Sequence, residues 1–248
     1  MRFDVFTLFP EVFVPYLDSS ILKRAQDEGY LEVHLHNIRD WATDKHHVTD
    51  DLPYGGGGGM VMKPEPIFRA VEAVVGSPPR CPVVLMTPQG ERLTQDKARA
   101  LSEHAHLALL AGHYEGVDER VRQHLVTHEI SIGDYVLTGG ELPALVLIDV
   151  LTRLISGVLG DPQAAEKDSH ATGLLEHPHF TRPAEFRGWH VPEVLRSGHH
   201  ARINRWRREQ ALRRTWQRRP ELLENADLSE EDEAFLDSLR EEEDGGEG

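Results

Sequence analysis

Apolar residues in the first 155 positions form short runs, separated by segments in which apolar residues recur with helical spacing. Five runs rich in β-branched, aromatic and leucine side chains predict strands; they lie at residues 2–9, 30–38, 82–87, 106–112 and 127–133. The intervening segments predict helices at residues 64–75, 94–104 and 116–125, the second with Thr94 as its N-cap, and a longer apolar helix that ends near Ile155. Strands that alternate with helices predict an α/β fold built on a mostly parallel sheet.

The pattern changes after residue 155. Residues 157–183 are rich in Gly, Pro, Ser and His and have no clear period, whereas residues 192–240 have the spacing of helices only. Long irregular segments are more often functional or disordered than inert. We therefore expect three parts: an α/β domain at residues 1–160, an interdomain linker at 161–183, and a small helical C-terminal domain with an acidic tail at 184–248.

Composition excludes several classes of protein. The single cysteine, Cys81, cannot form an internal disulfide, which fits a reducing compartment. The N-terminal apolar run is interrupted by Asp4 and Glu11, so it does not resemble a signal peptide, and no uncharged apolar stretch approaches 18 residues. We expect a cytoplasmic protein that does not insert into a membrane.

The net charge of −15 argues against a nucleic-acid partner for the chain as a whole, but charge is segregated along it. Residues 182–219 contain 11 arginines and 3 acidic residues, a net charge of +8, and residues 220–248 carry a net charge of −12. Arginine-rich helices with nearby aromatic residues suit a folded RNA with an exposed loop. We expect Arg205, Arg207 and Arg208 to contact RNA phosphates, and the acidic end of the chain to be solvated and frayed.

The apolar residues within this basic segment have a different expected role. They recur at helical spacing, which is more typical of a core than of a platform for stacking bases. They are Ile203, Trp206, Leu212 and Trp216.

Three of the predicted strands end in loops built from small residues. The loops are TPQG at 87–90, GHYEG at 112–116 and IGDYVLTGG at 132–140. In open α/β sheets ligands bind beyond the carboxyl ends of the strands, where small residues let the main chain reach a ligand. Each loop alone fits a tight turn equally well, but together they favour one pocket. None matches a phosphate-binding fingerprint, so a nucleoside without a phosphate tail suits them better.

Two further segments are candidates for binding. The run LPYGGGGGMVM at 52–62 fits a binding loop better than a linker, because flexible linkers mix glycine with serine. With 15 histidines in the chain, among them the nearby His46 and His47, a metal site must be considered. Neither the spacing of His46, His47, Asp50 and Asp51 nor the lone Cys81 fits zinc, so we expect no zinc site in the chain. The pair His34 and His36 shares one face of a predicted strand, and we expect both to face solvent.

In their order along the chain, these strings resemble bacterial tRNA (guanine-N1)-methyltransferases of the SPOUT superfamily. The strings are YGGGGGM, TPQG, GHYEG, ISIGDYVLTGGELPA, GVLG with the following DS, and GHHARINRWR with RTWQRRPELL, and they span about residues 1–225. The resemblance implies S-adenosyl-L-methionine as methyl donor, and as acceptor N1 of guanosine-37, immediately 3′ of the tRNA anticodon. It also implies a homodimer with active sites at the subunit interface and a deep trefoil knot at the cofactor site, whereas periodicity alone predicts an unknotted sheet.

The resemblance assigns roles to individual residues. It makes Asp168 the general base and Arg153 its electrostatic partner. It places the cofactor on Pro88, Gly90, Gly112, Tyr114, Glu115, Gly116, Ile132, Gly133, Asp134, Tyr135, Val136, Leu137, Gly139, Gly140 and Pro143. From the residues alone, Arg153 fits an ion pair with Asp149 one helical turn earlier equally well.

The chain departs from the family pattern at two positions near these residues. His170 stands where an aromatic residue commonly follows the DS pair, and Ser156 replaces a proline before GVLG. Because histidine titrates near neutral pH, His170 makes the pH profile of the reaction uncertain. The sequence also leaves open whether Mg²⁺ takes part.

Two other function classes remain open on the residues alone. One is a non-catalytic RNA-binding module in which the glycine loops are structural. The other is a nicotinamide-dependent oxidoreductase, which the missing dinucleotide fingerprint disfavours. Separate titrations with S-adenosyl-L-methionine and NAD distinguish all three, because the module binds neither.

Overall fold

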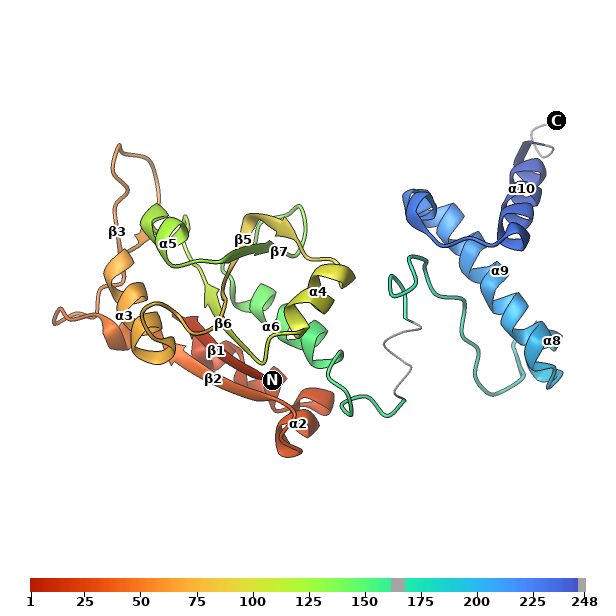
Figure 1. Cartoon of the computed structure of the whole chain (residues 1–248), viewed down its shortest axis with the longest axis horizontal. Coiled ribbons are helices and arrows are strands. Elements are labelled where there is room, and N and C mark those ends of the chain that lie inside the picture. The colour runs from red at the N-terminus through yellow and green to blue at the C-terminus, as the bar shows by residue number, and fades with distance from the viewer. Residues whose placement is uncertain (162–167, 245–248) are drawn as a thin grey trace. The chain divides into compact units, whose positions relative to one another are not determined.

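The computed structural model describes residues 1–161 and 168–244, and the chain divides into two compact units (Figure 1). The first unit is Met1–Pro162 and the second is Gln163–Gly248. Within the residues that the structure describes, no helix is both long and apolar enough to cross a bilayer.

The first unit is built on a five-stranded parallel sheet, which confirms the α/β prediction. The strand order is β2-β1-β6-β5-β7. The strands are β1 (Arg2–Thr7), β2 (Glu32–Asn37), β5 (Val83–Arg92), β6 (His106–Ala111) and β7 (His128–Ser131). A separate antiparallel pair is formed by β3 (Asp50–Asp51) and β4 (Val61–Met62).

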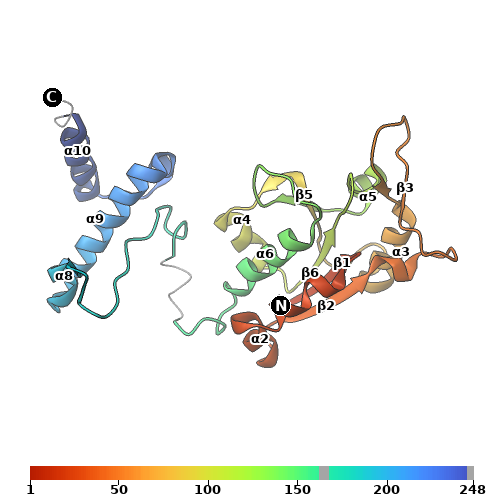
Figure 2. The same ribbon diagram turned by 180° about the vertical axis from the view of Figure 1, so that it is seen from behind.

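Helices cover both faces of this sheet, and each face has its own apolar core (Figures 1 and 2). One core joins the sheet to α2 (Ser20–Asp27), α4 (Gln95–Ser102) and α6 (Glu141–Thr152). The other joins it to α3 (Pro64–Val75) and α5 (Glu119–His124). Short turns at η1 (Pro10–Val12), α1 (Val14–Leu17) and η2 (Ile38–Trp41) complete the unit.

Local signals explain where these helices begin. As predicted, Thr94 caps α4, since its side chain accepts a hydrogen bond from the backbone N–H of Lys97 at 3.2 Å. Asp118 caps α5 in the same way through the N–H of Arg120 at 2.9 Å. The predicted helices at 64–75, 94–104 and 116–125 are therefore confirmed, with ends that differ by a few residues.

Strand β5 is longer than the sequence predicts. It was expected to end at residue 87, but it continues to Arg92 through an irregularity in its pairing with β7 between Met86 and Glu91. A Cβ atom on Gly90 would lie 2.4 Å from the carbonyl carbon of Glu129. Gly90 therefore permits a close approach of two backbones, a requirement that no apolar pattern reports.

A buried carboxylate lies within the sheet. Asp4 has no exposed surface and is hydrogen-bonded to Arg2 Nε at 2.8 Å, His36 Nε2 at 2.6 Å and His106 Nε2 at 2.6 Å. Burial acts to raise the pKa of Asp4, but these hydrogen bonds lower it to about 2. The prediction that His36 faces solvent is wrong, because its ring is hydrogen-bonded to Asp4 and stacks on Phe6. The side chain of His34 is exposed, as expected.

The second unit is mainly helical, as predicted, with one short hairpin. The hairpin pairs β8 (Glu185–Phe186) with β9 (Trp189–His190). The helices are α8 (Glu193–Arg196), α9 (His200–Arg218), the turn η3 (Pro220–Asn225) and α10 (Glu230–Asp244).

The core of the second unit brings distant segments together. Leu174, from the stretch that the sequence analysis assigns to a linker, packs with Leu212 of α9 and with Leu236 and Leu239 of α10. The prediction of helical structure up to residue 240 is confirmed by α10, and Leu236 and Leu239 of this helix lie in the core. The helix continues to Asp244, so the expectation that the acidic end is frayed is wrong for residues 241–244. Residues 245–248 lie outside the described residues.

Candidate functional site

A cavity of about 230 Å³ lies where the three small-residue loops meet, at the carboxyl ends of β5, β6 and β7. The structure brings together on its wall the predicted residues Pro88, Gly112, Tyr114, Glu115, Gly116, Ile132, Gly133, Tyr135, Val136, Leu137, Gly139, Gly140 and Pro143. Two predicted residues, Gly90 and Asp134, are described by the structure but do not line it. Loops separated by up to 50 residues in sequence therefore form one concave surface, as expected for an open parallel sheet.

The loops after β6 and β7 are held together by their backbones. The N–H of Gly140 donates to the carbonyl of Gly112 at 2.7 Å, and His113 and Gly139 form an isolated antiparallel β-bridge. A Cβ atom on Gly140 would lie 2.8 Å from Cα of Ala111. Any larger residue at 140 would therefore push the two loops apart.

A buried polar group lies beside the cavity at the start of α6. Glu141 is buried, and the hydroxyl of Thr7 donates to its Oε1 at 2.9 Å. His113 Nδ1 lies 3.8 Å from Glu141 Oε2, and among the described residues this buried nitrogen has no hydrogen-bond partner. His113 also lines the cavity, so this polar pair lies directly behind its wall.

The glycine-rich segment adjoins the same loops. The N–H of Glu115 donates to the carbonyl of Met60 at 3.0 Å, and the N–H of Met62 donates to the carbonyl of Gly116 at 2.9 Å. Tyr54, at the other end of the glycines, is fully exposed. The segment is thus anchored beside the cavity at Met60 and exposes an aromatic side chain to solvent.

Sequence reasoning missed several residues on the cavity wall. Arg122 of α5 contacts Gln89 and Glu129, and so ties α5 to the irregular part of β5. No sequence motif contains this arginine. Its role follows only from the structure, which places it next to Gln89 of β5 and Glu129 of β7. Thr87, Gln89, His113 and Thr138 also line the cavity and lie within the three loops expected to form it, although no individual role was predicted for them. The lining residues outside these loops that were not predicted are Leu85, Met86, Val117, Ile130 and Ser131.

The lining suits S-adenosyl-L-methionine. Main-chain groups of the three loops alternate with apolar and aromatic side chains, among them Ile130, Leu137 and Tyr135. The lining contains one guanidinium, that of Arg122, and it is already engaged by Gln89 and Glu129. Such a surface fits an adenosyl group that carries no phosphate.

The two predicted catalytic residues lie in different units. Arg153 is the C-cap of α6 and lines a second cavity of about 150 Å³ together with Tyr16, Ser19 and Asp149. The hydroxyl of Tyr16 donates to Asp149 Oδ2 at 2.5 Å, a hydrogen bond that raises the pKa of Tyr16. Arg153 does not line the first cavity.

Asp168 lies in a loop of the second unit that backbone hydrogen bonds stabilise. Its carbonyl accepts from the N–H of Ala171 at 3.1 Å, and the N–H of His170 donates to the carbonyl of Leu174 at 2.8 Å. The hydroxyl of the adjacent Ser169 accepts from the N–H of Glu176 at 3.0 Å. The pairing of Asp168 with Arg153 stays a prediction.

Five of the seven arginines of α9 fall into two groups, while Arg213 pairs with Glu242 and Arg214 donates to the carbonyl of Glu176. Arg205 and Arg208 bind the buried carboxylate of Asp232 on α10, at 3.1 and 3.0 Å. Burial acts to raise the pKa of Asp232. Hydrogen bonds from Arg208 and Ser229 act in the opposite direction, and the pKa lies below its ordinary value. These ion pairs contradict the expectation that Arg205 and Arg208 are available to RNA phosphates.

The second group is exposed. Arg202, Arg207 and Arg218 point to solvent, and no carboxylate in the described part of the chain pairs with them. The basic surface of α9 is therefore smaller than its sequence suggests, and it is formed by different residues.

Comparisons with known proteins agree with this arrangement. A family model described as tRNA (Guanine-1)-methyltransferase TrmD matches residues 1–225. Relatives named tRNA (guanine-N(1)-)-methyltransferase include that of Moorella thermoacetica, 60% identical over 241 residues and 96% of both chains. That of Dehalococcoides mccartyi strain 195 is 57% identical over 244 residues and 98% of both chains. Because these matches span both units at high identity, the chain belongs to the tRNA (guanine-N1)-methyltransferase TrmD family.

Proposed function

We propose that this protein transfers a methyl group from S-adenosyl-L-methionine to N1 of guanosine-37 in tRNA. The observation that carries the proposal is the match to the TrmD family, which covers the cavity loops of the first unit and the arginine-rich α9 of the second. The cavity wall, made of main-chain and apolar groups, supports the choice of cofactor. A tRNA substrate also implies that the enzyme works in the cytoplasm.

The reaction requires a base. N1 of guanine carries a proton and is a poor nucleophile until that proton leaves, and a carboxylate within hydrogen-bond reach can accept it. We assign this role to Asp168. As the proton moves to Asp168, negative charge develops on O6 of the base, which the planar guanidinium of Arg153 is suited to stabilise.

The remaining task of the protein is alignment. When bound, S-adenosyl-L-methionine supplies an electrophilic methyl group on its sulfonium. The loop residues around Gly112, Tyr135 and Gly140 hold and orient it, and N1 must lie in line with the bond that breaks. Arg153 belongs to the first unit and Asp168 to the second.

We further propose that the active species is a homodimer with a knotted SPOUT fold. Support for the knotted fold comes from membership of the TrmD family. Leu142 and Val146 lie one helical turn apart on α6 and are 56% and 41% exposed. Tyr16, bonded to Asp149 of the same helix, extends this apolar patch. Light scattering that finds an active monomer at assay concentration contradicts the dimer.

The central experiment is methyl transfer to bulk tRNA that lacks the modification, with the modified base then mapped. We expect the methyl group on N1 of guanosine-37, and a comparison with and without Mg²⁺ decides whether the ion takes part. Titration with NAD in place of S-adenosyl-L-methionine serves as the control. Binding of tRNA with neither cofactor binding nor transfer would instead establish a non-catalytic RNA-binding module.

A further inference from the structure

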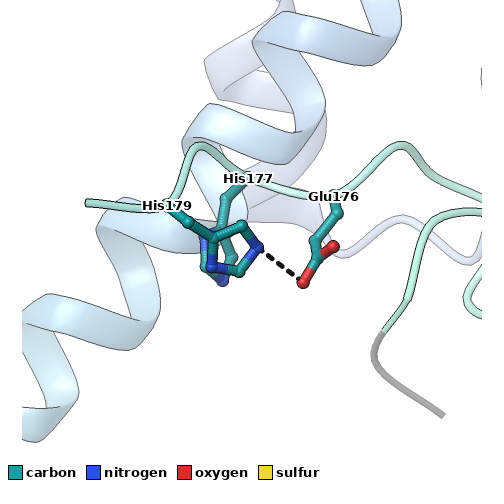
Figure 3. A group of neighbouring side chains, drawn as sticks. All are labelled: Glu176, His177 and His179. Atoms are coloured by element: carbon teal, nitrogen blue, oxygen red, sulfur yellow. Dashed lines mark ion pairs between the residues drawn. The ribbon is translucent and has the colours of Figure 1, made fainter. Parts of the chain in front are cut away.

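Three side chains outside the candidate methyl-transfer site converge in the second unit. Glu176, His177 and His179 each offer one ligand atom, and these atoms lie within 4.8 Å of one another (Figure 3). His179 Nε2 lies 2.8 Å from Glu176 Oε1, and the rings of His177 and His179 have centroids 4.7 Å apart. We propose that these three residues bind one divalent transition-metal ion of the Zn²⁺ type.

The donor set selects the class of ion. Two imidazoles and one carboxylate, with a position left for water, form a common protein environment for Zn²⁺. Magnesium and calcium prefer oxygen ligands, so the two imidazoles disfavour them. In a tetrahedral site with bonds of about 2.1 Å, ligand atoms are about 3.4 Å apart. His179 Nε2 and Glu176 Oε1 are 2.8 Å apart, so this distance needs to increase only slightly when an ion binds between the two atoms.

His177 is held in a state that can ligate. Its Nδ1 lies 3.2 Å from the carbonyl of Pro178, which places the proton on Nδ1 and the lone pair on Nε2. The hydrogen bond to Pro178 therefore orients the ring with Nε2 as the ligand atom.

The segment is anchored before any ion binds. The N–H of Leu175 donates to the hydroxyl of Thr215 on α9 at 2.9 Å, and Arg214 donates to the carbonyl of Glu176 at 3.0 Å. On the far side, Phe180 packs against Trp206 of α9, with ring centroids 6.4 Å apart. Preorganised ligands bind a metal more tightly because less chain entropy is lost.

The surrounding charge works against a cation. Arg207 acts on His177 electrostatically, and Arg214 is bonded to the segment itself. Affinity must therefore come from direct coordination and not from a general negative potential. A weakly held, nonspecific cation is not expected at this position.

The test uses the full-length protein stripped of metal with a chelator and titrated with Zn²⁺ or Co²⁺. Calorimetry should give one Zn²⁺ per chain, and Co²⁺ should produce the visible absorption of a tetrahedral site. H177A and E176Q should weaken binding by more than the 10–100-fold typical of losing an outer-shell partner. The matched control is the double variant H199A/H200A, which removes two adjacent exposed histidines at the start of α9.

The outcomes separate this site from other histidines and from the proposed reaction. Unchanged binding in H177A, or binding lost only in H199A/H200A, would overturn the site. Thermal melting in the absence of metal shows whether H177A and E176Q are folded, so weakened binding by folded variants supports it. The metal site does not depend on methyl transfer: an inactive protein that still binds Co²⁺ refutes the proposed function alone, and an active protein that binds no metal refutes only this site.

Discussion

The candidate binding surfaces of the two units are formed by different chemical groups. In the first, main-chain groups and small residues at the ends of a parallel sheet form the cavity, and its one arginine is already engaged by neighbours. In the second, side-chain charge on a single helix forms the surface. A main-chain site is revealed by short motifs and is insensitive to net charge. A side-chain site depends on which charges the fold leaves free.

This difference explains why the second surface was harder to predict. The segment 182–219 has a net charge of +8, but α10 packs against α9 and neutralises part of it. Asp232 is buried between Arg205 and Arg208, so these arginines hold the unit together. Net charge of a segment thus overestimates the charge available to a partner whenever an oppositely charged segment folds onto it.

The largest effect is expected from Asp168 of the second unit, the proposed general base. Asp168→Asn keeps the size of the side chain but cannot accept the N1 proton. Methyl transfer should fall about 10²–10⁴-fold, the range for a lost general base. Binding of S-adenosyl-L-methionine, which depends on the first unit, should hardly change. Single-turnover assays and calorimetry measure the two quantities.

The control for this prediction is His170→Phe, which removes the other nearby side chain that can accept a proton. If His170→Phe abolishes transfer and Asp168→Asn retains it, the base has been misassigned. Equal loss of cofactor binding in Asp168→Asn would instead contradict the separation of roles between the units.

Removing the structural arginines should affect folding of the second unit. In the double variant R205A/R208A the buried Asp232 loses both guanidinium partners. Leaving a buried charge unpaired costs about 3–5 kcal/mol in comparable pairs. Urea denaturation should show a less stable second unit. A stability equal to that of the unaltered protein would mean that these arginines are free to bind RNA after all.

Glycines of the first unit provide a smaller and more local test. Gly140→Ala places a Cβ atom 2.8 Å from the backbone at Ala111, so we expect a loss of about 1–3 kcal/mol in stability and weaker cofactor binding. The matched control is Gly112→Ala on the same cavity wall, whose Cβ would meet its nearest neighbour at an ordinary 3.6 Å. Thermal melting and calorimetry compare the two variants. Equal stability of both would contradict the close approach at Gly140.

The sequence predicts the first unit well because period and turn chemistry are local. Alternating apolar runs place all five strands of the parallel sheet, and the glycine loops identify most of the cavity wall. The extension of β5 was missed because it depends on contact between Gly90 and Glu129, which are distant in sequence. The helical spacing up to residue 240 also predicts most of α10. It does not predict that α10 packs on α9, because the ion pairs of Arg205 and Arg208 with Asp232 join residues that are distant in sequence.

The buried carboxylate of Asp4 in the first unit makes the free energy of unfolding depend on pH in the acid range. The pKa of Asp4 is about 2, below the model-peptide value of 3.8, so its contribution is complete above about pH 4 and is lost as the pH falls toward 2. The shift corresponds to about 2 kcal/mol. The pH dependence of unfolding between pH 5 and 2.5 should therefore be shallower in Asp4→Asn. Equal slopes for the variant and the unaltered protein would show that Asp4 is not held by Arg2 and the histidines.

The smallest effects are expected from the exposed arginines. Replacing Arg202, Arg207 and Arg218 with alanine removes charges that are free to meet phosphates, because they have no carboxylate partner among the described residues. Each loss should weaken tRNA binding a few-fold and reduce the slope of log affinity against log salt by up to about one unit. Arg240→Ala is the control, since Arg240 already pairs with Asp237 at 2.6 Å on α10. Binding measured across a salt series decides the point: a triple variant whose salt dependence matches that of Arg240→Ala would place the RNA surface elsewhere than on α9.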